Sequence, residues 1–249
     1  MILVTKKPFS QLLKGLVFFI ASLSYVTYSY AGSYSIQPVR ATLSAVQKVD
    51  ALTVTNQGTE VANIQLELMR WTQDEKGADV FEPTKDILAT PPILAIQPNA
   101  KQVIRLGLRR PPATDSEQTY RLFLKELPSP PKEGFTGLKV ALNMSIPIFV
   151  LPNVKLTPQI TWRLAVNAQK QLILYSHNQG KSHIQVANFT LKTEEKMLVS
   201  AQQVANYMLA QQKRAWPVKD AILNIGDKVQ LLAQTDVGEF QADLVVEAE

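Results

Sequence analysis

The sequence predicts an all-β protein built of two β-sandwich domains, and three observations carry this prediction. Short runs of alternating or β-branched residues recur along the chain, and clusters of Pro, Gly, Asn and Asp separate them. No long stretch combines a sustained helical period with helix caps. The 249 residues are 46% hydrophobic and 19% charged, which is the composition of an ordinary globular protein. Many short strands with turns between them favour sandwiches.

The N-terminal segment predicts an export signal. Residues 1–14 contain three lysines and no acidic residue, and residues 15–23 are almost all apolar. This run is too short for a membrane-spanning helix, which needs about 20 apolar residues. The small residues Ser29 and Ala31 then occupy the last positions that a signal peptidase requires. We expect residues 1–31 to be a signal peptide cleaved after Ala31, with an uncleaved membrane anchor as the alternative.

Charge and cysteine content narrow the function further. The formal net charge is +5, and removal of the three signal-peptide lysines lowers it to +2, so nucleic acid is a poor candidate partner. The chain has no cysteine, which excludes disulfides, thiolate metal sites and cysteine nucleophiles. An exported chain that is stabilised by packing alone suits the bacterial periplasm, where we expect the mature 218 residues to work.

Prolines divide the chain into strands and domains. Three Pro-Pro pairs cannot lie inside central strands and therefore predict loops. Leu151-Pro152-Asn153 follows the longest predicted strand, so we place the domain boundary there. The domains are then residues 32–151 and 152–249, each about the 100 residues of an immunoglobulin-like sandwich. The predicted strands are 36–44, 51–56, 62–71, 102–108, 120–126, 138–150, 159–166, 171–176, 183–192, 229–234 and 241–246.

One segment of the second domain is ambiguous. Residues 194–209 have apolar positions at loosely helical spacing, so the sequence leaves open a helix or a strand–loop–strand. The residues that follow, 207–210 and then 214–217, predict a loop that runs into a strand.

No catalytic constellation is present, and we expect neither an enzyme nor a metal or cofactor. The two histidines, His177 and His183, lie in a loop-like stretch without a neighbouring acidic ligand, which favours structural or surface roles. The sequence contains no Gly-x-Ser-x-Gly elbow and no glycine-rich phosphate loop. The pair Glu194-Glu195 is more typical of a solvated loop than of a general acid and base. A secreted hydrolase on an all-β scaffold would lack any recognisable nucleophile and base.

The strand 138–150 carries the most information. Apolar side chains alternate along it for about twice the usual strand length. This face either lines the core of its own domain or lies at a sheet edge where a partner strand can add. Pro147 favours the edge, because proline cannot donate to a central ladder. The alternating positions are Leu138, Val140, Leu142, Met144, Ile146 and Ile148.

Several segments together resemble the periplasmic chaperones of the chaperone/usher pilus pathway. The matching segments are residues 36–43, 52–56, 90–93, 96–106, 124–128 and 140–152, and residues 174–180 of the second domain match loosely. The resemblance implies two immunoglobulin-like domains in an L-shaped arrangement. It also implies a divergent member, of the kind that serves archaic or alternative pili.

Donor-strand complementation is the function that this resemblance implies. A pilin subunit lacks the last strand of its own sandwich, and the chaperone inserts a strand into the open groove without using a nucleotide. The partners are pilin subunits and the outer-membrane usher, and self-association of the donor strand in the free protein is left open. The donor residues would be Leu138, Val140, Leu142, Met144 and Ile146. The alternative is a secreted two-domain pilus subunit or surface adhesion module.

The resemblance further implies that basic residues bind the C-terminal carboxylate of the subunit between the domains. Arg40 matches the arginine of the family's first strand, and a guanidinium can bind a carboxylate through two hydrogen bonds. The second basic residue of the best-known branch falls at Pro147, so it is missing here. We expect Arg121 to replace it, with Arg105 as a weaker candidate.

A second departure concerns the ion pair that links the two domains in that branch. Its basic residue falls at Leu151, whereas its acidic counterpart matches Glu126. The sequence therefore leaves open how the two domains are held together.

Overall fold

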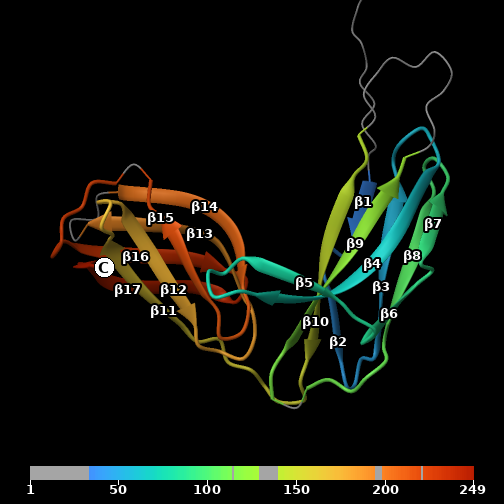
Figure 1. Ribbon diagram of the computed structural model, residues 1–249, viewed down its shortest axis with the longest axis horizontal. Coiled ribbons are helices and arrows are strands. Elements are labelled where there is room, and N and C mark those ends of the chain that lie inside the picture. The colour runs from blue at the N-terminus through green and yellow to red at the C-terminus, as the bar shows by residue number, and fades with distance from the viewer. Residues whose placement is uncertain (1–33, 114, 129–139, 194–197, 220) are drawn as a thin grey trace, which may run out of the picture.

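The computed structural model describes residues 34–113, 115–128, 140–193, 198–219 and 221–249. These residues form two all-β lobes that stand at an angle to each other (Figure 1), as the sequence predicts. No helix occurs in the described part of the chain, so none there is long and apolar enough to cross a membrane. The predicted signal peptide, residues 1–31, lies outside the described residues.

The described residues of the first domain form ten strands in two sheets. One sheet has the order β1-β3-β8-β6, and the other has the order β2-β10-β9-β4-β5 with β7 paired to β4. The strands are β1 Tyr34–Gln37, β2 Ala41–Ser44, β3 Val49–Asn56, β4 Ala62–Gln73, β5 Asp79–Pro83, β6 Ile87–Thr90, β7 Ile93–Ile96, β8 Lys101–Leu108, β9 Gln118–Leu127 and β10 Asn143–Leu151. Their inward side chains form one core, in which Leu52, Ile64 and Leu122 are fully buried. Burial of each such side chain stabilises the fold by roughly 1.5–3 kcal/mol.

The N-terminal strand changes sheets, which the sequence did not predict. The expected single strand 36–44 is broken at residues 38–40, so that β1 pairs with β3 in one sheet and β2 pairs with β10 in the other. Proline at position 38 cannot donate to a ladder, which is consistent with a break there. Because β2 begins only at Ala41, it covers the last four residues of β10 and no more.

Three short strands of the first domain were also missed. β5 is exposed along its whole length, and β6 and β7 have four residues each, so none of them shows a long alternating pattern. The predicted loop at Pro91-Pro92 is confirmed, since it separates β6 from β7. In Figure 1 the hairpin formed by β4 and β5 extends from the first domain towards the second.

The described residues of the second domain form one seven-stranded sheet that curves around its own core. Its order is β14-β13-β16-β17-β11-β12-β15, and buried residues from all seven strands meet in one cluster. The strands are β11 Ile160–Val166, β12 Leu172–Asn178, β13 Ile184–Thr193, β14 Leu198–Met208, β15 Lys213–Pro217, β16 Lys228–Thr235 and β17 Gly238–Ala248. The ambiguous segment is therefore a strand where it is described, because β14 pairs along β13 and no cap favours a helix. The predicted loop begins later than expected, since Tyr207 and Met208 still belong to β14.

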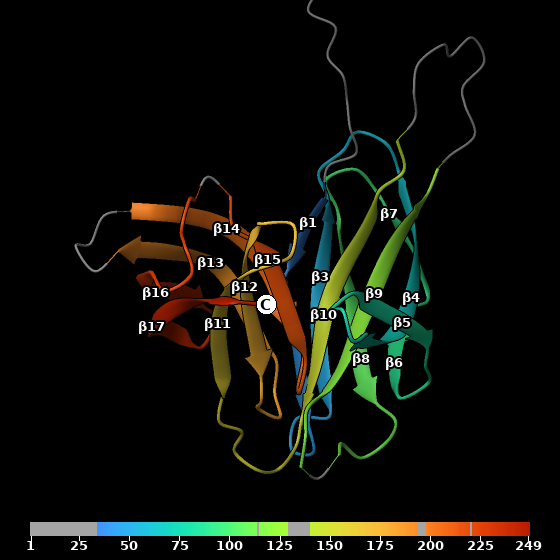
Figure 2. The ribbon, with the colours of Figure 1, turned by 60° about the vertical axis from the view of Figure 1, so that its left-hand side comes forward.

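An apolar cluster joins the two domains, which lie next to each other in Figures 1 and 2. Trp71 of β4 and Phe149 of β10 pack against Tyr207 of β14 and against Leu209, the residue that follows this strand. The Trp71 and Tyr207 rings meet edge to face at 5.3 Å. Gln73 adds two polar links, since its amide donates to the Tyr207 carbonyl at 3.0 Å and accepts from the Leu209 N–H at 2.9 Å. Side chains of both kinds thus fix the domains against each other.

Candidate functional site: an open strand edge beside two arginines

The first half of β10 lies at a sheet edge. β9 pairs with the strand from Asn143 to Val150, whereas β2 pairs only with the stretch from Ile148 to Leu151. On the side opposite β9, residues 143–147 therefore have no strand partner in the described part of the chain. Their outward backbone groups can pair with an added strand.

The position of β2, with Arg40 just before it, indicates the direction in which a strand with a charged end would add at this edge. A strand that adds at this edge parallel to β10 continues the line of β2, which is itself parallel to β10. Its carboxyl end would then meet the start of β2, where Arg40 lies. An antiparallel strand would place its amino end there. A positively charged residue at this point favours the parallel orientation, because it attracts the terminal carboxylate.

Two arginines flank the edge at one level. Pro147 pairs with Arg121 of β9, and Ala41 of β2 pairs with Ile148, so Arg40 is the next residue beside Pro147 on the other side. Tyr120, Ile148 and Ala41 face the core in the adjacent row, so the row that contains the arginines faces the opposite side, towards the second domain. The structure thus brings together two residues that are 81 positions apart in the sequence.

The Arg121 guanidinium is poorly partnered. It lies 3.9 Å above the Trp71 ring and 5.4 Å from the Tyr207 ring, and its Nη1 donates a long 3.5 Å hydrogen bond to the Ser145 hydroxyl. Its buried Nε has no hydrogen-bond partner, and within the described residues no carboxylate lies at ion-pair distance. Burial lowers the pKa of Arg121 from its ordinary value. A ligand carboxylate would therefore satisfy a buried donor and a cation together.

Arg40 is held by the second domain instead. Its Nη1 lies 3.5 Å from Oδ2 of Asp236, in the turn between β16 and β17, and its side chain is half exposed. Asp236 also contacts His183, which in turn contacts Glu117 beside β9. The arginine is thus both close to solvent and fixed by a carboxylate of this chain.

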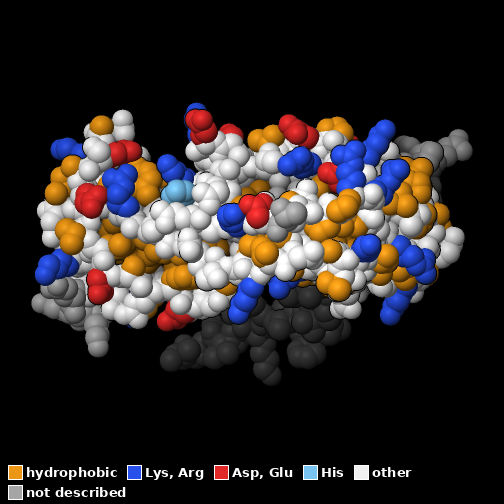
Figure 3. Space-filling model, turned by 90° about the horizontal axis from the view of Figure 1, so that it is seen from below, with side chains coloured by type: hydrophobic (Ala, Val, Ile, Leu, Met, Phe, Trp, Pro, Cys, Tyr) orange, Lys and Arg blue, Asp and Glu red, His pale blue; other side chains and the backbone are white. Residues whose placement is uncertain are grey.

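The predicted donor residues differ in how far their side chains are exposed to solvent. Val140 is 62% exposed and Leu142 is half buried, but both precede β10, so the strand is shorter than the predicted 138–150. Met144 packs partly against the core, and Ile146 belongs to the core itself. Leu138 lies outside the described residues. Apolar side chains are exposed elsewhere too, and Figure 3 shows them interspersed with Lys and Arg over one face of the molecule.

Within the described residues, the hydrogen bonds of the Glu126 side chain stay inside the first domain. One of its carboxylate oxygens accepts from the Tyr34 hydroxyl at 2.6 Å and the other from the Leu142 N–H at 3.0 Å. Burial and the neighbouring Glu126 carboxylate raise the pKa of Tyr34. Glu126 therefore fixes the entry to β10, at the opposite end of the strand from Leu151.

Arg105 is placed on the other sheet of the first domain. It lies on β8, between Ala51 of β3 and Thr90 of β6, with an exposed side chain. The structure does not bring it together with Arg40 and Arg121.

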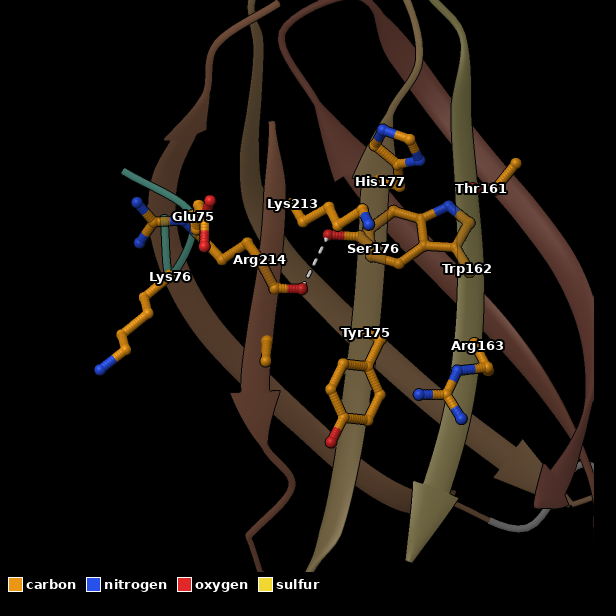
Figure 4. Close-up of a pocket in the computed structure, with 11 residues that line it drawn as sticks. Glu75, Lys76, Thr161, Trp162, Arg163, Tyr175, Ser176, His177, Lys213 and Arg214 are labelled. Carbon is orange, nitrogen blue, oxygen red and sulfur yellow. Dashed lines mark hydrogen bonds between the residues drawn. The ribbon is translucent and has the colours of Figure 1, made fainter. Parts of the chain in front are cut away.

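A separate pocket of about 460 Å³ lies between the β4–β5 hairpin and the sheet of the second domain (Figure 4). Its polar groups are largely engaged within the chain. Arg163 lies over the Tyr175 ring at 4.5 Å and pairs with Glu247 at 3.7 Å, and the Tyr175 hydroxyl donates to Glu249 at 2.6 Å. Arg214 donates to the Gly77 carbonyl at 2.5 Å, which joins the hairpin to this wall. Within the described residues, no group of three His, Asp or Glu side chains could hold a metal ion there or elsewhere.

Sequence reasoning missed three residues that join the domains at their interface. Glu117, His183 and Asp236 are far apart in the sequence, and no spacing or motif connects them. The prediction that His183 is structural agrees with its position, but its two carboxylate partners could only be seen once the domains were packed. Trp71, above whose ring the Arg121 guanidinium lies, was likewise not singled out in the sequence.

The comparisons with known proteins agree with this architecture. Residues 33–155 match the family of pili and flagellar-assembly chaperones, PapD N-terminal domain. The chain is 27% identical over 151 residues to the chaperone protein PapD of Escherichia coli, an alignment that covers 59% of this chain. It spans 58% of the length of that curated relative.

Solved chaperones share the whole two-domain fold. A chain of the CsuC–CsuE chaperone–tip adhesion subunit pre-assembly complex, from archaic chaperone-usher Csu pili of Acinetobacter baumannii, matches with a TM-score of 0.63 and 21% identity. The match covers 87% of this chain and 100% of that one. The YadV chaperone matches with a TM-score of 0.61 and 19% identity, over 85% of this chain and 99% of that one. The match places the first domain in the family of pili and flagellar-assembly chaperones, and the described chain shares the two-domain fold of the solved chaperones.

Proposed function

We propose that this protein is a periplasmic chaperone that binds pilin subunits by donor-strand complementation and delivers them to the outer-membrane usher. A relative in Salmonella enterica, the SafB chaperone, was solved in complex with the SafA pilin, and it shares this fold with a TM-score of 0.60 at 16% identity. Relatives of this chain are chaperones rather than enzymes. We accordingly assign no catalytic role to any residue.

The observation that carries the proposal is the open half of β10 next to Arg40 and Arg121. The subunit strand would add parallel to β10 at residues 143–147, with its C-terminal carboxylate between the two guanidinium groups. Leu138, Val140 and Leu142, with part of Met144, would fill the pockets left by the missing strand of the subunit. Each large aliphatic side chain that is fully buried contributes roughly 1.5–3 kcal/mol.

The remaining assignments follow from the sequence. The signal peptide would comprise residues 1–31 and be cleaved after Ala31, which delivers the chain to the periplasm. The domain boundary would lie at Leu151 and Pro152, between the end of β10 and the first strand of the second domain. Neither nucleic acid nor a cofactor is part of the proposal.

The experiment is co-expression with the small secreted β-proteins encoded beside this chain, followed by affinity pull-down from the periplasm. The wild-type chain is expected to recover a subunit that is degraded or aggregated without it. Arg40→Ala and Arg121→Ala should each reduce recovery. Arg105→Ala is the matched control, since it removes an arginine from the other sheet and should leave recovery unchanged. Absence of any recovered subunit would overturn the chaperone assignment, and equal recovery by all three variants would overturn the anchor.

A further inference from the structure

A line of charged groups crosses the domain interface and ends at Arg40. His183 lies just before β13 in the second domain, and its Nδ1 is 2.8 Å and 3.0 Å from the two carboxylate oxygens of Glu117, which precedes β9 in the first domain. Its Nε2 is 3.3 Å from Oδ2 of Asp236. The same oxygen of Asp236 lies 3.5 Å from Nη1 of Arg40, back in the first domain. The line therefore crosses the interface twice.

Backbone contacts and ring stacking fix His183, Glu117 and Asp236, the members of this line other than Arg40. The His183 N–H donates to Glu117 at 3.2 Å, and the Gln185 N–H donates to Asp236 at 2.8 Å. The imidazole stacks on the Phe149 ring of β10, with 3.6 Å between ring centres and an interplanar angle of 8°. The side chains of His183, Glu117 and Asp236 are 12%, 2% and 15% exposed, so water competes little for their hydrogen bonds.

We propose that His183 is a positioning residue for subunit capture: it bridges Glu117 and Asp236, and so fixes both the angle between the domains and the orientation of Arg40. This inference rests on the proposed function, because it assigns Arg40 to the subunit carboxylate. Asp236 then has two tasks, since it holds the guanidinium towards the edge of β10 while no subunit is bound and is itself held by His183. Loss of the bridge leaves Arg40 attached to a carboxylate that can move.

The bridge requires a proton on both ring nitrogens, because each nitrogen faces a carboxylate. Burial opposes the charged form, but the hydrogen bonds to Asp236 and Glu117 outweigh it and raise the pKa of His183. The groups that face the imidazole are Glu117 beside β9, Asp236 between β16 and β17, Tyr207 of β14 and the uncharged ring of Phe149 on β10. Arg40 lies behind Asp236, and the exposed pair Lys181–Asp115 links the same two loops. A rise in pH above the His183 pKa removes one donor, so one carboxylate loses its partner.

The test uses the folded mature chain and a defined probe. The probe is an acetylated hexapeptide of alternating Thr and Val with a free C-terminal carboxylate, and its C-terminal amide is the reference ligand. The measured quantity is the ratio of the two affinities at pH 6 and at pH 9. The wild-type chain is expected to prefer the carboxylate at pH 6, and this preference should decline towards pH 9.

His183→Gln is expected to reduce the preference at pH 6 by about fivefold, at the low end of ordinary coupling between sites, and to abolish most of its pH dependence. Glu117→Gln keeps the histidine and is expected to act in the same direction, so the test survives if the first variant folds poorly. His177→Gln is the matched control, because it changes the other histidine of the chain, on the wall of the separate pocket.

The outcomes distinguish this inference from the function on which it rests. If the wild-type chain prefers the carboxylate, but His183→Gln and Glu117→Gln keep both the full preference and its pH profile, the positioning role is overturned and the anchor stands. If the wild-type chain shows no preference at all, the anchor is overturned and the positioning role with it.

Discussion

Both halves of β10 have an apolar residue at every second, inward-facing position, namely Met144, Ile146, Ile148 and Val150, but the surroundings of the two halves differ. From Ile148 to Leu151 the strand lies between β9 and β2, and Ile148 is fully buried. From Asn143 to Pro147 it has β9 on one side only, and the residues that lead into it are increasingly exposed. One half thus holds the first domain together, while the other half offers the same kind of surface to a partner. Alternation alone therefore does not distinguish a core strand from an interface strand.

The largest expected effect comes from the buried half. Ile148→Ala should lower the free energy of unfolding by about 2–5 kcal/mol, because it leaves a cavity in a packed core. The measurement is denaturant unfolding followed by circular dichroism. Val140→Ala is the counterpart in the exposed segment and should change stability by no more than about 0.5 kcal/mol. Equal losses in the two variants would mean that the exposed segment is part of the core after all.

Substitutions in and just before the open half of β10 should reduce subunit capture and leave the stability of the chain almost unchanged. Leu142→Glu places a charge where a subunit pocket would need an apolar side chain, so recovery of a co-expressed subunit should fall at least tenfold, about the effect of 1.4 kcal/mol. Denaturant unfolding should show only a small change, because Leu142 lies outside the main core cluster. The ratio of recovered subunit to chaperone measures the effect, with Val140→Ala as a milder step. A variant that unfolds but still captures subunits would contradict the division between the halves.

Much of the fold could be predicted from the sequence, because local patterns report it. The proline loops, most of the long strands and the two sandwiches follow from alternation and turn residues. The break at residues 38–40 and the short strands β5 to β7 could not be predicted, since strands of four or five residues carry too little pattern. The segment that forms β14 was ambiguous for a similar reason, and its pairing with β13 decides its conformation.

The site was predictable only in part. Arg121 could be proposed because it falls on the strand next to β10, and the register confirms that position opposite Pro147. Its contact with Tyr207 depends on how the domains meet, which sequence patterns do not encode. The same holds for Glu117, His183 and Asp236. The role of Arg121 as an anchor stays a prediction, and so does the role of Glu117, His183 and Asp236 as a link between the domains.

A smaller effect tests the shape of the anchor. Arg121→Lys keeps the charge but loses the planar guanidinium that stacks on Trp71 and can bind a carboxylate through two hydrogen bonds. Subunit recovery should fall several-fold, less than with Arg121→Ala. Dissociation rates of the subunit, measured by surface plasmon resonance, would distinguish the wild-type chain, Arg121→Lys and Arg121→Ala. Identical rates for Lys and wild type would mean that only charge matters at this position.

The last prediction concerns the effect of pH on the link between the domains. The pKa of His183 is raised in the folded chain, so its contribution to stability is complete below its unfolded value of about 6.5 and is lost as pH rises through the folded pKa. The pKa of Asp236 is lowered: although burial opposes this, the hydrogen bond from His183 and other contacts outweigh it. Its contribution is therefore lost in acid, as pH falls through the folded pKa. His183→Gln should cost about 1–3 kcal/mol near pH 6 and less near pH 9. A constant difference between the two proteins, measured by thermal unfolding across this range, would contradict the bridge.

Hydrogen exchange of backbone amides tests the central claim most directly. The mature chain is compared alone and in complex with a co-purified subunit, with residues 140–147 and 148–151 followed separately by mass spectrometry. Strand addition at the open edge predicts that exchange slows strongly in residues 140–147 on binding, while residues 148–151 stay equally protected in both states. Unchanged exchange in residues 140–147, with protection gained elsewhere on the surface, would show that the subunit binds without using this edge.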